Sequence, residues 1–381
     1  MDFELTDEQR QLQDSVARFV QDNYSFEQRR AIVATDAGFS EDHWKQMAEL
    51  GWLGLALPED HGGIGLGPVE TMILMEEFGK GLVAEPYLAT VVLGAGAVVH
   101  GGSDAQKNAL LPAVAEGKLK LALGFAERQS RYNLADVATT AKPLRDGTFT
   151  LNGMKGVVFG APAADKIIVS ARTSGGPRDA DGISLFIVDK GQAGVTVRGY
   201  PTADGLRAGE VTLENVEVGQ DAMIGGMGEG LPVLEKVIDY AIAAIAAEAT
   251  GAMSHLNDMT LEYTKTRKQF GVAIAVFQAL QHRMVDMVIA TEQARSMATL
   301  AAVKADAPNA AERRRALSAA KAYVGQQARF VGQQAVQLHG GMGVVDELNV
   351  SHYFKRLTMI NATFGDADHH LGLFSDMLLA A

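Results

Sequence analysis

The sequence predicts an α+β protein of several domains, in which a helical part is followed by a β part and then by a second helical part. Helix signals dominate residues 1–118 and 223–381, and strand signals dominate residues 119–222. At 381 residues, the chain is long enough for two or three packed units. Its 47% hydrophobic and 21% charged residues are typical of a globular protein.

The first helical part is expected to contain short helices with clear starts. A Ser or Thr cap accepts a hydrogen bond from a free amide at a helix start, and a Gln three residues later completes a capping box. Starts of this kind, together with a proline that suits the first turn, are Thr6 with Gln9, Ser40, Pro68, and Ser103 with Gln106. The stretch LPEDHGGIGLG (57–67) is interpreted as a loop.

The middle part carries the signals of a small all-β unit. In LRDGTFTLNGMKGVVF, Asp146-Gly147 and Asn152-Gly153 stand at hairpin spacing between runs rich in Thr, Val and Phe. Further short strands are predicted from KIIVSART, ISLFIVDK, GVTVRGY and GEVTLENVEV. The stretch SGGPRDADG is expected to form an exposed loop.

The last part is expected to contain three long helices. The first is expected from Leu231 towards Phe270, and Gly251 marks a place where it can bend. The second carries a near-heptad stripe of apolar residues, which predicts core or subunit-interface packing and not a cofactor site. The stripe consists of Phe277, Leu280, Met284 and Met287. The third helix follows ERRR (312–315) and runs to Leu338.

Composition excludes several classes of function. A net charge of −12, from 34 basic and 46 acidic residues, argues against nonspecific binding to nucleic acid or to anionic membranes. The absence of cysteine excludes disulfides, thiolate chemistry and Cys-ligated metals. The polar start MDFELTDEQRQ does not resemble a signal peptide, and the longest apolar run is shorter than the ~20 residues that span a bilayer. We therefore expect a cytoplasmic protein.

Motifs for other ligands are missing. No G-x-G-x-x-G follows a predicted strand, and no G-x-x-x-x-G-K-[ST] occurs, so neither a Rossmann site nor a P-loop is predicted. DADHH (366–370) places two Asp and two His close together, but no second group of ligands stands at a useful spacing. We expect no metal site.

Two glycine-bearing breaks, QLHGG (337–341) and TFGD (363–366), enclose a predicted helix. Glycine lets a backbone approach a ligand closely, although two helix C-caps would give the same pattern. Together with RKQFG (267–271), FQALQHRMVDM (277–287) and the 57–67 loop, these breaks make the chain resemble the acyl-CoA dehydrogenase family along its whole length. Stretches such as GPVETMI, EPYLATVVLG, AERQSRYNLADVATTA and HYFKRLTMI are most similar to the small-subunit type of pimeloyl-CoA dehydrogenase.

This resemblance implies an acyl-CoA dehydrogenase-like fold. A helical N-domain (1–118) would precede a middle β-barrel domain (119–222) and a C-terminal four-helix bundle (223–381) that builds tetramers. It also implies a reaction: a carboxylate removes a proton from the carbon α to the thioester, and the β hydride passes to the flavin. That carboxylate needs a dry pocket that tunes its pKa.

Neither base position of the family carries a carboxylate here. Most members place a Glu directly before the Gly of a Y-E-G-T string, and the aligned residue in this chain is Phe364. A minority places the Glu on the long helix before RKQFG, where this chain has Ala241, followed by Ile242 in place of the usual Arg. We therefore assign no catalytic residue.

The resemblance also implies a damaged site for the flavin ring. The family loop T-E-P-G-A-G-S-D reads Ala126–Asn133 here, and Arg131 and Tyr132 replace small residues. The W-I-T string that shields the ring aligns with Val157-Val158-Phe159. In addition, Asp366 and Asp368 stand where neutral Thr and Gln meet the pyrophosphate, and their charges would repel it.

One half-site survives. In the family, the Arg of R-K-x-F-G and the Gln and Gly of Q-x-x-G-G reach across a dimer to the ADP half of the neighbour's FAD, and an Arg beside a Gly-lined backbone suits a diphosphate. The matching residues are Arg267, Gln269, Phe270, Gln337, Gly340 and Gly341. The alternative interpretation is helix-end capping, with Arg267 in a surface ion pair.

These departures predict a subunit of a heteromeric FAD-dependent acyl-CoA dehydrogenase that completes the FAD site of a catalytic partner, in an α₂β₂ arrangement with two FAD per tetramer. By resemblance, the acyl-CoA would be a dicarboxylyl-CoA such as pimeloyl-CoA, or a bulky ester such as a sterol side-chain thioester. Two alternatives remain. One is an active homotetramer that uses Asp239 or Glu248 as its base, and the other is a non-enzymatic scaffold that binds CoA esters or another protein.

Overall fold

The structure is a computed structural model that describes residues 4–379. These residues form two compact units. The helical unit contains the described residues up to Ala31, residues 68–83, and the residues from Ile242 onward. The mixed unit contains residues 32–67 and 84–241. No helix among the described residues combines the length and the apolar character needed to cross a membrane.

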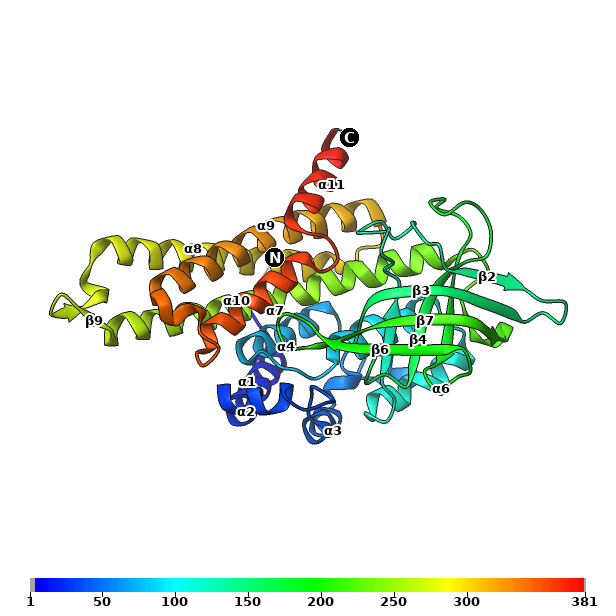
Figure 1. Cartoon of the computed structure of the whole chain (residues 1–381), viewed down its shortest axis with the longest axis horizontal. Coiled ribbons are helices and arrows are strands. Elements are labelled where there is room, and N and C mark those ends of the chain that lie inside the picture. The colour runs from blue at the N-terminus through cyan, green and yellow to red at the C-terminus, as the bar shows by residue number, and fades with distance from the viewer. Residues whose placement is uncertain (1–3, 380–381) are drawn as a thin grey trace. The chain divides into compact units, whose positions relative to one another are not determined.

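The helical unit is built mainly from long helices, several of which lie alongside one another in Figure 1. They are α1 (Asp7–Asn23), α2 (Phe26–Val33, whose last two residues fall in the mixed unit), α4 (Pro68–Gly81), α7 (Gly230–Thr266, which begins in the mixed unit), α8 (Gln278–Ala305), α9 (Ala310–His339), α10 (Asn349–Ala362) and α11 (Ala367–Leu379). The capping box at Thr6 and Gln9 is confirmed, with hydrogen bonds of 3.2 and 2.9 Å, and Pro68 begins α4 as predicted.

The mixed unit combines short helices with one sheet. Its other helical elements are α3 (Glu41–Glu49), η1 (Trp52–Gly54), η2 (Glu59–His61), the π-helical η3 (Leu88–Ala95), α5 (Gly96–Gly101), α6 (Asp104–Ala115) and η4 (Gln220–Ala222). The caps predicted at Ser40 and Ser103 are confirmed. The fold class of the sequence prediction is therefore correct, with helices before and after a β region.

The sheet has the order β6-β7-β3-β2-β4-β5-β8, and β1 pairs in parallel with β4. Figure 1 shows β2, β3, β4, β6 and β7 together in this region. Its strands are β1 (Leu121–Gly124), β2 (Thr140–Pro143), β3 (Phe149–Phe159), β4 (Lys166–Arg172), β5 (Ile183–Asp189), β6 (Val195–Pro201), β7 (Arg207–Val218) and β8 (Met223–Ile224). Apolar side chains such as Leu151, Ile167, Phe186 and Val211 form its core.

Two details of the prediction are wrong. Asn152-Gly153 is not a turn, because β3 continues through it: Asn152 pairs with Thr140 across the ladder, and its Oδ1 accepts a hydrogen bond from the Asn215 amide. The register against β7 instead shifts at this point, so the two residues form an irregularity within the strand. The long helix ends at Thr266, four residues early, because the chain enters a short hairpin of β9 (Lys268–Gln269) and β10 (Val272–Ala273).

Glycine permits a close crossing of α4 and α7 in the helical unit. The helix α7 runs unbroken through Gly251, where a bend was predicted as an option. A Cβ at Gly251 would lie 1.8 Å from the carbonyl oxygen of Glu76, and a Cβ at Gly79 would lie 2.0 Å from the carbonyl oxygen of Glu248. Both distances are far below van der Waals contact. The two glycines therefore serve helix packing and not flexibility.

Gly251→Ala is expected to lower the free energy of unfolding by about 2–3 kcal/mol, because the new methyl group meets fixed backbone. Gly372→Ala is the matched control, since Gly372 also lies inside a helix but a Cβ there would meet nothing within 4 Å. That control should be neutral or stabilising by up to about 1 kcal/mol. Urea unfolding of both variants gives the two values. Equal effects would contradict the packing role of Gly251.

Candidate functional site

The break at residues 363–366 keeps a strained backbone although Phe364, at the expected base position, carries no carboxylate. Phe364 and Gly365 both have positive φ angles, of 59° and 112°. The ammonium of Lys321 donates to the carbonyls of Gly365 (2.5 Å) and Asn361 (2.8 Å), and Nε2 of His370 donates to the carbonyl of Phe364 (2.9 Å). Buried side chains thus hold residue 364 in the left-handed conformation, which costs energy for any residue with a Cβ.

The second base position is apolar and buried. Ala241 lies on α7 in the mixed unit with no exposed surface, and Ile242 follows it. Glu248, seven residues further on, is buried in the helical unit in a two-pronged ion pair with Arg356, in which both N–O distances are 2.6 Å. Asp239 is also buried, two residues before Ala241. Both oxygens of Glu248 are therefore occupied by a guanidinium.

The N-terminus of α11 already holds a carboxylate. Oδ1 of Asp366 accepts a hydrogen bond from the amide of His369 (2.9 Å), which makes Asp366 the cap of this helix. A helix N-terminus is a favourable place for a phosphate, but here the position is occupied by the chain's own negative charge. In the part of the chain that the structure describes, no group of three or more His, Cys, Asp or Glu residues could hold a metal.

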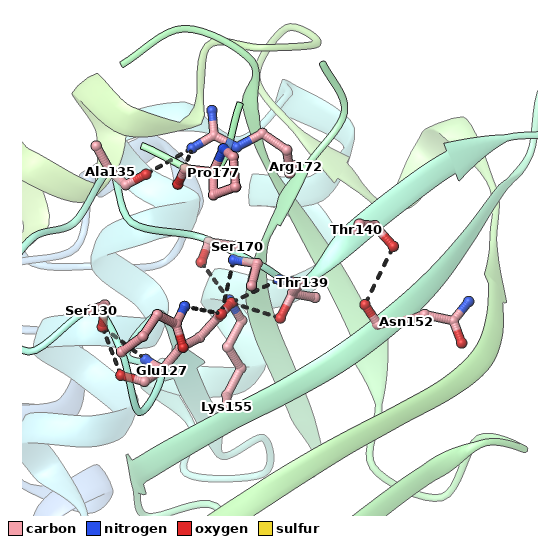
Figure 2. Close-up of polar contacts among 12 residues, drawn as sticks. Glu127, Ser130, Ala135, Thr139, Thr140, Asn152, Lys155, Ser170, Arg172 and Pro177 are labelled. Atoms are coloured by element: carbon pink, nitrogen blue, oxygen red, sulfur yellow. Dashed lines mark hydrogen bonds and ion pairs between the residues drawn. The ribbon is translucent and has the colours of Figure 1, made fainter. Parts of the chain in front are cut away.

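Glu127, in the 126–133 loop, forms a buried ion pair with Lys155 of β3, as Figure 2 shows. The carboxylate accepts hydrogen bonds from Lys155 Nζ (2.6 Å), from the amides of Ala138 and Thr139 (2.9 and 3.0 Å) and from the Thr139 hydroxyl (2.7 Å). Burial alone would raise the pKa of Glu127, but the charge of Lys155 and the side-chain hydrogen bonds from Lys155, Gln129 and Thr139 lower it to about 2. Lys155 also donates to the Ser170 hydroxyl at 2.9 Å.

Arg172 fixes the neighbouring loops. Its guanidinium donates to four backbone carbonyls, at 2.7 to 3.0 Å. The acceptors are Ala135, Pro177, Asp179 and Asp181. Two of these contacts are drawn in Figure 2. The 174–182 stretch is a loop, as predicted, but one that a buried side chain holds in place.

The structure brings together the two segments expected at the flavin ring. The amide of Gly156 donates to the carbonyl of Ala126 at 2.9 Å, so the 126–133 loop starts beside the irregularity in β3. Val157 lies in this irregularity with a φ of +50°, which is unusual for a β-branched residue, and its side chain is 48% exposed. Arg131 also has a positive φ angle and is exposed. Val157 and Phe159 stand here at the positions predicted for the Trp that shields the flavin ring and for the Thr that supplies a hydroxyl.

The ends of α7 and α9 meet in the helical unit. The ring of Tyr263 stacks on His339 with centroids 4.2 Å apart, and its hydroxyl donates to the His339 carbonyl at 3.3 Å. Arg267 follows Tyr263 by one turn, and Gly340 follows His339 directly. The two groups of predicted ADP-side residues therefore emerge from one pair of helix ends.

All six predicted ADP-side residues are exposed: Arg267, Gln269, Phe270, Gln337, Gly340 and Gly341. Phe270 is 91% exposed and has a positive φ angle. A Cβ at Gly340 or Gly341 would meet nothing within 4 Å, so the backbone there is open to a ligand. No interaction among the described residues joins Arg267 to Gln337 directly, and the six stay a prediction.

The residues of the predicted apolar stripe differ in burial. Met287 is buried, and its backbone carbonyl lies 3.5 Å from the side-chain nitrogen of Asn257 on α7. The core interpretation of the stripe is thus confirmed for Met287, and the subunit-interface interpretation stays a prediction. Three further apolar residues of α8, about half exposed, line a groove of about 390 Å³ together with Leu261, Met284 and Met287; they are Val285, Val288 and Ile289.

Comparisons with known proteins agree with this architecture. A 3-(aryl)acrylate reductase of Clostridium sporogenes is 31% identical over 340 residues, which are 86% of this chain and 87% of that protein. A solved Tcur3481-Tcur3483 steroid ACAD variant is 29% identical with a TM-score of 0.87 over 98% of both chains. The ChsE4-ChsE5 complex from Mycobacterium tuberculosis is 25% identical with a TM-score of 0.88 over the full length of both chains.

Family models match nearly the whole chain. The model of the acyl-CoA dehydrogenase N-terminal domain matches residues 6–118, that of the middle domain matches residues 122–216, and that of the C-terminal domain matches residues 228–379. The chain therefore belongs to the acyl-CoA dehydrogenase family.

Proposed function

We propose that this chain is the non-catalytic subunit of a heteromeric, FAD-dependent acyl-CoA dehydrogenase, similar to the small-subunit type of pimeloyl-CoA dehydrogenase. The reaction of the complex is the α,β-dehydrogenation of an acyl-CoA thioester. One contrast carries the proposal: both base positions, Phe364 and Ala241, are apolar, whereas the residues expected at the ADP half of a flavin remain and are uncovered.

The ADP-side residues fit a diphosphate. Arg267 supplies a permanent positive charge, Gln337 supplies an amide, and Gly340 and Gly341 leave room for a phosphate beside the backbone. FAD bound in the partner supplies the hydride acceptor of the reaction. In this proposal, the present chain binds and orients the ADP half of that FAD across the interface.

The ring side of this chain does not fit a flavin of its own. Asp366 occupies the N-terminus of α11 with a carboxylate, and Asp368 adds a second charge in the same turn. The segment from Gly156 to Phe159 offers neither the aromatic shield nor the hydroxyl of the family. We therefore assign no chemical step to this chain, and the partner subunit supplies the Glu that removes the α proton.

An α₂β₂ assembly with two FAD per tetramer follows from this division of roles. Two similar solved structures, Tcur3481-Tcur3483 and the ChsE4-ChsE5 complex, each carry two component names. The exposed apolar face of α8 suits the interface between the two subunits; it is formed by Val285, Val288 and Ile289. Single exposed apolar residues are common on protein surfaces, whereas a group of them indicates a site of association.

The substrate belongs to the partner's pocket in this proposal. A dicarboxylyl-CoA such as pimeloyl-CoA, or a bulky ester such as a sterol side-chain thioester, remains the expected class. A location in the cytoplasm and domain limits at 118/119 and 222/223 are part of the same proposal.

An active homotetramer is the second candidate, with Asp239 or Glu248 as the base. The ion pair of Glu248 with Arg356 weighs against that residue.

The isolated chain should show no ordinary acyl-CoA dehydrogenase activity. Loss of a general base alone reduces rates by about 10²–10⁴. The measurement compares turnover of pimeloyl-CoA and of a steroid side-chain CoA ester by the purified chain and by the complex that it forms in its source. Turnover by the isolated chain at the rate of the complex would contradict the proposal.

Arg267→Ala should weaken FAD retention by the complex by about ten- to a hundredfold, because charge-assisted hydrogen bonds contribute about 1.5–3 kcal/mol. Lys265→Ala is the control: it also removes an exposed cation, from a surface pair with Glu262. The complex is dialysed at a series of increasing dilutions, and the FAD that remains bound to each complex is then measured by absorbance. If Arg267 serves only a helix end, both variants will keep their flavin.

Glu248→Gln should destabilise the fold by about 3–5 kcal/mol, since it leaves Arg356 buried without its counter-charge. The double variant Glu248→Met with Arg356→Met should recover most of that loss. Glu262→Gln, in an exposed pair, should cost less than about 1 kcal/mol. A Glu248→Gln chain that unfolds like the wild type, in a complex that has lost its activity, would favour Glu248 as the base.

A further inference from the structure

The helices α7, α8 and α9 are joined to one another near the end of the helical unit that carries β9 (Figure 1). The stacked rings of Tyr263 and His339 join α7 to α9. The hydroxyl of Thr264 donates to the sulfur of Met284 at 3.4 Å, which joins α7 to α8. The predicted ADP-side residues lie at this same end, so a third contact, between α8 and α9, brings a further part of the chain close to them.

The third contact places a cation and an amide beside the predicted residues. Nη1 of Arg283, on α8, donates to Oε1 of Gln334, on α9, at 3.3 Å. Gln334 precedes Gln337 by three residues, and side chains at this spacing are neighbours on a helix surface, about 5–6 Å apart. The amide nitrogen of Gln334 makes no hydrogen bond within residues 4–379, so it remains available to donate to an anion.

This end of the helical unit is cationic although the chain as a whole is acidic. The net charge of the chain is −12, yet residues 267–285 and 313–345 contain neither Asp nor Glu. The cations of the first range are exposed and form no ion pair in the part of the chain that the structure describes; they are Arg267, Lys268 and Arg283. Asp286, the next carboxylate along α8, lies one turn further from β9. Positive charge gathered without counter-charges attracts an anion.

We infer that Arg283, oriented by Gln334, is a second contact for the diphosphate of the partner's FAD, beside Arg267. This role rests on the proposed function and adds two residues that lie outside the family strings R-K-x-F-G and Q-x-x-G-G. A diphosphate has two phosphoryl groups, and the planar fork of a guanidinium suits the oxygens of each. Arg283 acts by charge and by hydrogen bonds to phosphate, and it takes no part in the chemical step.

Arg283→Gln should weaken FAD retention by the complex about three- to tenfold, which is less than the effect of Arg267→Ala, because solvent screens an exposed charge. Arg283→Lys should recover part of this loss, since it keeps the charge but not the fork. Arg329→Gln is the matched control. Arg329 is also exposed, lies on α9 five residues before Gln334, and has no ion pair in the described chain, so its removal changes the net charge equally.

Retention is measured by dialysis of the assembled complexes, as for Arg267→Ala, at about 50 mM and about 500 mM salt. Salt should weaken FAD binding less in the Arg283→Gln complex than in the wild type, because one screened charge contact is absent. Salt dependence equal to that of the wild type would assign Arg283 a purely structural role and overturn the inference.

The same series separates this inference from the proposed function. Retention lowered by Arg267→Ala but not by Arg283→Gln would overturn the role of Arg283 and leave the proposed function standing. Retention unchanged in both variants would contradict both. Equal losses in Arg283→Gln and Arg329→Gln would reflect net charge alone and would also overturn the role of Arg283.

Discussion

The close crossing of α4 and α7 is the constraint on which the helical unit depends. Gly79 and Gly251 bring the two backbones so near that each glycine faces the carbonyl of a Glu on the other helix. The side chains of those two residues, Glu76 and Glu248, are buried at the crossing and are paired with Arg295 of α8 and Arg356 of α10. The crossing and its two ion pairs thus connect four helices, and the Glu248 carboxylate is part of this packing.

In the proposed account, this chain has lost the chemistry of its family while it keeps the family's fold. Phe364, which aligns with the base in the sequence prediction, has a positive φ angle, and Lys321 and His370 hold the backbone there. Val157, which aligns with the ring-shielding Trp in the same prediction, also has a positive φ angle. Phe and Val rarely adopt positive φ angles. The surrounding contacts, and not a preference of these residues, therefore account for the two angles. A scaffold of this kind can still assemble with an active relative.

Local signals allowed much of the fold to be predicted from the sequence. Caps at Thr6, Ser40 and Ser103 act over three residues, and their helices were placed correctly. Asn152-Gly153 misled the prediction because its dipeptide is typical of a turn, whereas pairing with strands on both sides keeps it in the sheet. The apolar period on α8 located the helix, but it left open which residues face the core, and Met287 proved to be buried.

The candidate site was less predictable, since its contacts join distant residues. The partners Glu127 and Lys155 are 28 residues apart, and those of Lys321 are 40 and 44 residues away. A buried lysine of this kind has no local signature, because its hydrogen-bond partners come together only on folding. The apolar character of the two aligned base positions, Phe364 and Ala241, could be read from the sequence alone. The pairing of Glu248 with Arg356 could not, because the two residues are 108 positions apart and meet only on folding.

The central claim is that this chain completes a flavin site without holding one. Its most direct test is the flavin content of two preparations: the chain purified alone, and the complex with its partner. In each preparation, the amount of released FAD is divided by the amount of each chain. The account predicts essentially no FAD in the isolated chain, even after incubation with excess FAD, and one FAD for each pair of unlike chains in the complex. One FAD for every chain, in either preparation, would contradict it.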